Sequence, residues 1–220
     1  MSPVDLRLYA LLDPDNAGGH DLPSLAGAIA PHATLVQLRD KHSSTRAMIA
    51  RARALHAVLA PRGVPLLIND RIDVALACGA EGVHVGWDDM EPADARRLLG
   101  PKAVIGLSIK SVRQVEVAPL DVLDYVVIGG VFATISKDNP DPPVGLDGLK
   151  TILAAVRARA PQMPVAAIAG IDAANAGDVI AAGADGVSVI SALSRAGDPA
   201  VAAKALRGVV DASLAARIKS

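Results

Sequence analysis

Eight short runs rich in Val, Ile and Leu recur along the chain, and longer segments with helical spacing separate them. Stretches such as Ser44–Ala60 and Leu149–Ala160 place apolar residues three and four positions apart, which predicts helices. Strands that alternate with helices form parallel βαβ units, and eight units in one domain predict an α/β fold, the (βα)8 TIM barrel, over residues 1–220. An open doubly wound sheet is the alternative. The predicted strands are Leu6–Asp13, Leu35–Lys41, Pro65–Asp70, Gly82–Gly86, Val104–Lys110, Tyr125–Phe132, Pro164–Gly170 and Gly186–Ser191.

Composition narrows the class of protein. Hydrophobic residues make up 51% of the chain and aromatic residues 2%, so Ala, Val, Leu and Ile must build the core. The formal net charge is −1 and no basic stripe stands out, so we expect no nucleic-acid partner. Aspartates interrupt the longest apolar region, residues 164–193, so we expect no membrane association. The N-terminal apolar run is too short for a signal peptide and Cys78 has no intrachain partner, which predicts a cytoplasmic protein. The sequence leaves open whether the protein forms a homo-oligomer.

The second predicted strand ends in Gln-Leu-Arg-Asp-Lys. Strand alternation puts Gln37, Arg39 and Lys41 on one face, and Leu38 and Asp40 on the other. Two cations and an amide on one face predict an anion site at the carboxyl end of the barrel, where TIM barrels carry their active sites. A surface strand with extended Arg and Lys side chains is the alternative.

Acidic residues gather at the next two strand ends. Asn69 and Asp70 end the third strand, and Asp88 and Asp89 follow the fourth. Converging carboxylates repel one another unless a cation lies between them, and hard oxygen ligands suit Mg²⁺ together with phosphate oxygens. Alternatively, Asp70 and Asp89 each cap a helix.

Other strand ends carry weaker signals. Ser108 ends the fifth strand, with Lys110 close by, and is either functional or a turn residue. A glycine after the seventh strand and a serine at the end of the eighth fit the common barrel phosphate site. His84 is either a hydrogen-bonded core residue or a base. Trp87 is either a lid over a flat ring or loop packing.

Several of these segments, in this order and spacing, resemble those of the thiamine phosphate synthase family. They are VQLRDK, LLINDRIDVALACGAEGVHVGWDDM, IGLSIK, FATISKDNPDPPVGLDGL, VAAIAGI and GADGVSVISAL, and the resemblance extends from about Leu8 to about Leu193. It implies a (βα)8 barrel that joins a hydroxymethylpyrimidine diphosphate to a thiazole phosphate, or to its carboxylated form, and releases pyrophosphate. It also implies one Mg²⁺ ion per subunit.

The resemblance implies roles for individual residues. The residues expected to bind the pyrimidine diphosphate are Gln37, Leu38, Arg39, Asp40, Lys41, Asn69, Ser108 and Lys137. Four of them, Arg39, Lys41, Ser108 and Lys137, are the expected catalytic residues. Thiazole phosphate binding falls to Thr134, Ile135, Ser136, Gly170, Ile190 and Ser191, and metal binding to Asp70 and Asp89. The loop Val131–Leu146, with prolines at 140, 142 and 143, is expected to bridge the two substrates and to close as a lid.

The chain departs from the common family pattern at three places. Trp87 stands where a glutamine is usual, and Lys110 where a histidine is frequent. The segments GGVFAT and AIAG stand where the family more usually has a proline after the first glycine and a double glycine. Two other functions stay open. One is a thiazole tautomerase, which shares the barrel but joins no rings. The other is a non-catalytic barrel that binds a phosphorylated thiamine precursor.

Overall fold

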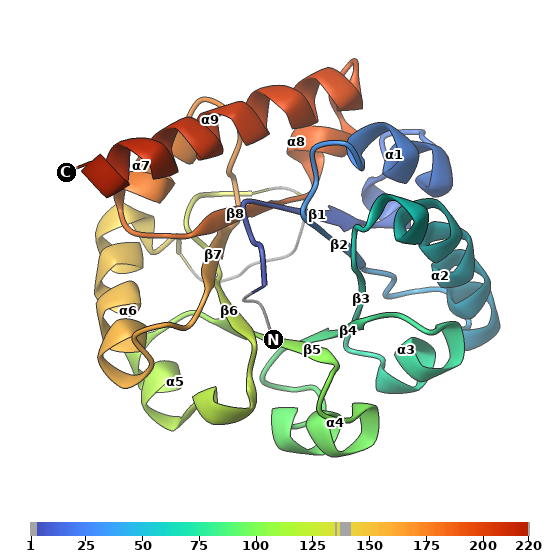
Figure 1. Cartoon of the computed structure of the whole chain (residues 1–220), viewed down its shortest axis with the longest axis horizontal. Helices are drawn as coiled ribbons and strands as arrows, with labels where there is room; N and C mark the ends of the chain where they lie inside the picture. The colour runs from blue at the N-terminus through green and yellow to red at the C-terminus, as the bar shows by residue number, and fades with distance from the viewer. Residues whose placement is uncertain (1–3, 135, 137–141, 220) are drawn as a thin grey trace.

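The fold is a closed barrel of eight parallel strands, in which each strand pairs with the next and β8 pairs with β1 (Figure 1). The computed structural model describes residues 4–134, 136 and 142–219. The predicted TIM barrel is confirmed and the open sheet is wrong. The strands are β1 Leu8–Leu12, β2 Leu35–Leu38, β3 Leu66–Asn69, β4 Gly82–Val85, β5 Val104–Ile109, β6 Tyr125–Ile128, β7 Val165–Ile168 and β8 Gly186–Val189.

Helices form a ring around the barrel (Figure 1). Polar side chains start several of them: Ser44 and Ser111 accept hydrogen bonds from backbone N–H groups in the first turns of α2 and α5. Gly79, with φ of 76°, ends α3 as expected of a helix C-cap. The helices are α1 Leu22–Ile29, α2 Thr45–Leu59, α3 Ile72–Cys78, α4 Pro92–Leu99, α5 Val112–Val117, α6 Gly145–Arg159, α7 Ala176–Ala181, α8 Ser191–Ser194 and α9 Pro199–Lys219. The part of the chain that the structure describes also contains the short 3₁₀ helices η1 Pro14–Asn16, η2 Ala60–Arg62 and η3 Leu120–Val122.

Position within a strand decides which core a side chain enters. In β1, Tyr9 and Leu11 belong to the cluster inside the barrel, whereas Leu8, Ala10 and Leu12 belong to the larger cluster under the helices. This alternation follows from the two-residue period of a strand and makes every strand buried on both faces. No described helix is long and apolar enough to cross a membrane.

The strands end earlier than predicted. β2 ends at Leu38, so Arg39, Asp40 and Lys41 lie in the following loop, and β6 ends at Ile128. The predicted strands also included residues 39–41 after β2 and residues 129–132 after β6. These residues therefore belong to the loops at the carboxyl end of the barrel.

Candidate active site

A cavity of about 420 Å³ opens at the carboxyl end of the barrel. Strands and loops from around the whole barrel contribute its walls, as expected for a TIM barrel site. Nine predicted site residues line it: Gln37, Arg39, Asn69, Ser108, Thr134, Ser136, Gly170, Ile190 and Ser191. The fold therefore brings together residues that lie more than 150 positions apart in the sequence.

Seven predicted residues are not among the described residues that line this cavity, and three of them, Lys41, Asp70 and Asp89, form the charged group described below. Leu38 packs in the core between barrel and helices. The Asp40 carboxylate accepts hydrogen bonds from Arg51 and from the backbone N–H of Ser43 at 3.0 Å, beside α2. Ile135 and Lys137, and most of the predicted lid, lie outside the described residues.

Arg39 is held in place by an aspartate that sequence reasoning missed. Its Nη1 atom donates to the Asp13 carboxylate at 2.6 Å, and Asp13 is 2% exposed. Asp13 directly follows β1 and also accepts from the backbone N–H of Asp15 at 2.9 Å. The available sequence signal for this contact was an aspartate directly after a buried strand, but such an aspartate is also typical of an ordinary helix N-cap. The Arg39 guanidinium is thus fixed at the rim of the cavity.

Lys41, Asp70 and Asp89 form a charged group beside Asn69. Lys41 Nζ donates to Asp70, and the Asp89 carboxyl group lies within hydrogen-bonding reach of Asp70. Burial, and then the neighbouring Asp89, raise the pKa of Asp70 to about 6, although Lys41 opposes the shift. The backbone of Asp70 has a φ of 63°, a left-handed conformation uncommon for a non-glycine residue, so the carboxylate is held here at some cost.

The capping alternatives for Asp70 and Asp89 are wrong. α3 begins after Arg71 and α4 after Glu91, and neither helix has a side-chain cap. Asp89 instead accepts from the backbone N–H of Gly86 at 2.7 Å. Two adjacent carboxylates, one with a raised pKa, suit a hard divalent cation whose other ligands are water and phosphate oxygens. Among the described residues, no group of three or more His, Cys, Asp or Glu forms a complete protein site, so substrate oxygens would have to complete it.

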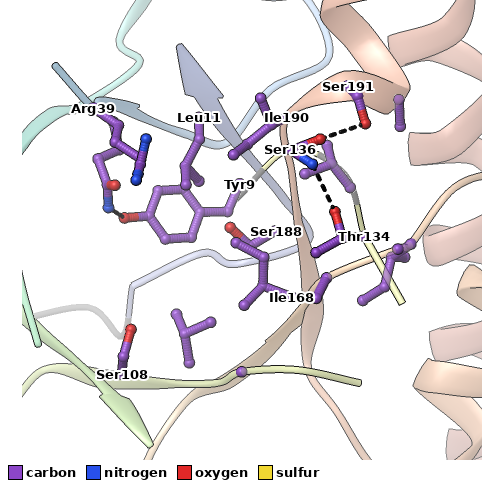
Figure 2. Close-up of a pocket in the computed structure, with 18 of the residues that line it drawn as sticks. Tyr9, Leu11, Arg39, Ser108, Thr134, Ser136, Ile168, Ser188, Ile190 and Ser191 are labelled. Carbon is purple, nitrogen blue, oxygen red and sulfur yellow. Dashed lines mark hydrogen bonds between the residues drawn. The ribbon is translucent and has the colours of Figure 1, made fainter. Parts of the chain in front are cut away.

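Neutral hydroxyl groups gather on the opposite side of the cavity. Ser136 Oγ lies 2.9 Å from Ser191 Oγ, and the Ser136 N–H donates to Thr134 Oγ1 at 3.2 Å (Figure 2). Gly170, with φ of 63°, faces this group; a Cβ there would overlap the Ala133 carbonyl oxygen and Phe132. Phosphate sites are commonly built from hydroxyl groups and from backbone N–H groups that can approach the phosphate closely.

The sequence left the roles of His84 and Trp87 undecided, and the structure shows the contacts that each side chain makes. His84 is buried and hydrogen-bonded: Nε2 lies 2.8 Å from Ser108 Oγ, and Nδ1 lies 2.9 Å from the Tyr125 hydroxyl. Trp87 Nε1 donates to the Ser108 carbonyl oxygen at 2.8 Å, and its ring does not line the cavity. Trp87 therefore packs at the rim and leaves room for a ligand.

Two further cations line the cavity. Lys110 lines it beside Gly129. Arg195 lies in the segment after α8 and lines the cavity near Asn16. Sequence reasoning considered Lys110 and missed Arg195, because nothing in the local pattern distinguishes Arg195 from a surface arginine. Together with Arg39, they give the described lining of the cavity three cations against one acidic residue, Asp172.

A TIM barrel whose cavity is lined by cations and hydroxyl groups, with a carboxylate pair next to the lining residue Asn69, is typical of enzymes that act on small phosphorylated molecules. The thiamine monophosphate synthase family model matches residues 8–193. The chain belongs to this family.

Individual relatives agree with that assignment. The chain is 54% identical to a thiamine-phosphate synthase of Agrobacterium fabrum, over 99% of each chain. It is 48% identical to a thiamine-phosphate synthase of Albidiferax ferrireducens, over 94% of this chain and 93% of the relative. The solved structure of a thiamine phosphate pyrophosphorylase from Pyrococcus furiosus superposes with a TM-score of 0.82 at 32% identity, covering 96% of this chain and 98% of that one.

Proposed function

We propose that this protein is a thiamine-phosphate synthase, a transferase that joins a hydroxymethylpyrimidine diphosphate to a thiazole phosphate and releases pyrophosphate. The observation that carries this proposal is one cavity with Arg39 at its β2 side, next to the Lys41–Asp70 pair, and with neutral hydroxyl groups at its β6 to β8 side. Two phosphorylated substrates that must meet in one place need two such anchors. A cytoplasmic location and a single domain over residues 1–220 are part of the same proposal.

The pyrimidine diphosphate binds on the charged side. Arg39, fixed by Asp13, offers a planar donor pair to the diphosphate, and Ser108 offers a hydroxyl across the cavity. Lys41 exchanges Asp70 for a phosphate oxygen when the ligand arrives. Gln37 and Asn69 contact the ring, and Leu38 and Asp40 contribute through their backbone, since their side chains point elsewhere.

Asp70 and Asp89 would hold one Mg²⁺ ion. The fit rests on their adjacency and on the raised pKa of Asp70, which a cation would reverse. When bound, Mg²⁺ neutralises charge on the diphosphate and so makes pyrophosphate a better leaving group. The two carboxylates contribute the negative charge and the fixed position that such an ion needs.

The thiazole phosphate binds on the neutral side. Thr134, Ser136, Gly170 and Ser191 surround its phosphate, and Ile190 packs against the ring. Ile135 and Lys137 belong to the same proposal by the family resemblance.

The reaction needs no protein nucleophile. The bond between the pyrimidine methylene carbon and the diphosphate oxygen breaks, and pyrophosphate leaves with the electron pair. The thiazole ring nitrogen then supplies an electron pair to the methylene carbon. Arg39, Lys41, Ser108 and Lys137 stabilise the leaving group by fixed charges and dipoles, and the phosphate anchor of the thiazole supplies proximity.

A pyrophosphate-release assay with single omissions tests the proposal. We expect release only when both substrates and Mg²⁺ are present. A folded protein that converts the thiazole phosphate alone would be a tautomerase. One that binds both ligands in calorimetry but gives no product after long incubation would be a binding barrel. Either result would overturn the proposal.

A further inference from the structure

Below the cavity, five polar side chains form one continuous chain of hydrogen bonds through the barrel interior. Gln37 Nε2 donates to the Tyr9 hydroxyl, which lies 2.9 Å from the Tyr125 hydroxyl. Tyr125 lies 2.9 Å from His84 Nδ1, and His84 Nε2 lies 2.8 Å from Ser108 Oγ. The first and last members, Gln37 and Ser108, line the cavity, as do Tyr9 and His84, whereas Tyr125 is not among its lining residues. The chain thus begins and ends at the substrate site.

The inner members are buried side chains. Tyr9 and Tyr125 are 0% exposed and His84 is 7% exposed. The two phenol rings meet edge to face with centroids 5.7 Å apart, and a Cβ at Gly106 would overlap the Tyr125 ring, so this ring fits only because residue 106 is glycine. Burial raises the pKa of both phenols, so each keeps its one hydrogen to donate.

The direction of donation can be traced from Gln37. Its Nε2 atom can only donate, so the Tyr9 oxygen accepts and the Tyr9 hydrogen goes to Tyr125. The Tyr125 hydrogen then goes to His84 Nδ1, which must be unprotonated. His84 Nε2 therefore carries the hydrogen and donates it to Ser108 Oγ. The Ser108 hydrogen is left to donate into the cavity.

The opposite direction can be distinguished chemically. If the Gln37 oxygen accepted from Tyr9, each hydrogen bond would reverse, His84 would carry its hydrogen on Nδ1, and Ser108 would donate to His84. The cavity would then receive only an acceptor from Ser108. An ionised diphosphate offers only acceptors, so a Ser108 without a free hydrogen would repel it.

We propose that this hydrogen-bond chain holds His84 as its neutral Nε2–H tautomer and thereby keeps Ser108 a hydrogen-bond donor to the diphosphate. The proposal rests on the proposed function, since the diphosphate is its substrate. His84, Tyr125 and Tyr9 are positioning residues, because they act through Ser108. At the other end, Gln37 Oε1 is buried without a hydrogen-bond partner among the described residues, so it stays an acceptor for an amino group of the pyrimidine.

Nitrogen NMR of the imidazole rings in the ligand-free protein tests the tautomer directly. Of the five histidines, His84 is the buried one, so its ring signals can be assigned with a His84→Asn variant. We expect a protonated Nε2 and an unprotonated Nδ1. A protonated Nδ1 with an unprotonated Nε2, or an imidazolium at neutral pH, would overturn the proposal.

Tyr125→Phe removes one hydroxyl and keeps the ring. We expect the His84 signals to show loss of the single tautomer, and kcat to fall about tenfold while KM for the thiazole phosphate stays within about twofold. Ser188→Ala is the matched control: Ser188 is also buried inside the barrel, its Oγ has no partner among the described residues, and it lies outside the chain. It should leave the His84 signals unchanged.

The two proposals fail separately. If the wild-type protein releases no pyrophosphate but shows the Nε2–H tautomer, the proposed function is wrong and the hydrogen-bond direction stands. If it releases pyrophosphate and Tyr125→Phe changes neither the tautomer nor kcat, the positioning role is wrong. Should Tyr125→Phe fail to fold, the tautomer in the wild-type protein decides.

Discussion

The two sides of the cavity differ in how their polar groups are satisfied before a substrate arrives. On the charged side, Arg39 pairs with Asp13 and Lys41 with Asp70. On the neutral side, Thr134, Ser136 and Ser191 hydrogen-bond among themselves. The charged side must exchange partners to accept an anion, whereas the neutral side is already shaped for one. We call residues 13, 39, 41, 70 and 89 the charged half, and residues 134, 136, 170 and 191 the neutral half.

This difference matches the two chemical tasks. The diphosphate leaves during the reaction, so the charged half must stabilise charge that grows on a leaving group. The thiazole phosphate is kept throughout, so the neutral half needs only to hold a constant charge in place. Changes in the charged half should therefore lower kcat, and changes in the neutral half should raise KM for one substrate.

The largest effect is expected for Asp89→Ala. Loss of one of two carboxylates removes most of the charge that holds Mg²⁺, and turnover should fall about 10²- to 10³-fold. Pyrophosphate release measures it, and circular dichroism checks the fold. Asp88→Ala is the matched control, because Asp88 is the exposed neighbour; its turnover should stay within about threefold. Equal losses in both variants would contradict a specific role for Asp89.

The next largest effect is expected for Arg39→Ala. Removing a charge-assisted donor should lower kcat/KM for the pyrimidine diphosphate about 10- to 100-fold. Arg51→Ala is the matched control, since Arg51 also pairs with a buried aspartate, Asp40, but beside α2. Both variants leave a buried carboxylate without its arginine and should lower the Tm. Only Arg39→Ala should change the kinetics, and an equal kinetic change in Arg51→Ala would break the assignment.

Gly170→Ala tests the neutral half. The new Cβ would overlap the Ala133 carbonyl oxygen, and the residue would stay at a φ of 63°, so the phosphate pocket must shift. We expect KM for the thiazole phosphate to rise about tenfold, with KM for the pyrimidine diphosphate unchanged. Gly79→Ala carries a similar backbone penalty at φ of 76° with no atom within 4 Å, so it should cost stability alone. A rise in both KM values would contradict two separate halves.

The smallest effect concerns pH. The pKa of Asp70, about 6 against a usual 3.8, means that the folded metal-free protein holds a proton that the unfolded chain releases. The stability contributed by Asp70 is therefore full below 3.8 and is lost as pH rises through about 6. Mg²⁺ reverses this loss, so the Tm increase on adding Mg²⁺ should be larger at about pH 7.5 than at about pH 5. A pH-independent increase, or the same pH dependence in Asp70→Asn, would contradict it.

Much of the fold and of the cavity lining followed from the sequence because both depend on local periodicity. A buried parallel strand alternates between two cores, so Gln37 could be placed inside the barrel and Leu38 outside it. The site residues lie where the strands end, which the apolar runs mark. The prediction was wrong on strand length: β2 ends at Leu38, and Lys41, 41% exposed in its side chain, pairs with Asp70 in the loop.

Contacts between distant residues were beyond the sequence. Tyr9 and Tyr125 are 116 residues apart, and each looks like an ordinary apolar strand residue. Asp13 caps η1 as its local sequence suggests, yet its second contact, with Arg39, depends on the register between β1 and β2. Such pairings follow from barrel closure, which no local pattern encodes.

A structure with Mg²⁺ and pyrophosphate bound tests the central difference between the two halves most directly. We expect oxygens of Asp70 and Asp89 about 2.0–2.1 Å from one ion, with Lys41 moved from Asp70 to a phosphate oxygen, while Ser136 and Ser191 keep their contact. An ion bound away from both carboxylates, with the Lys41–Asp70 pair intact, would contradict it.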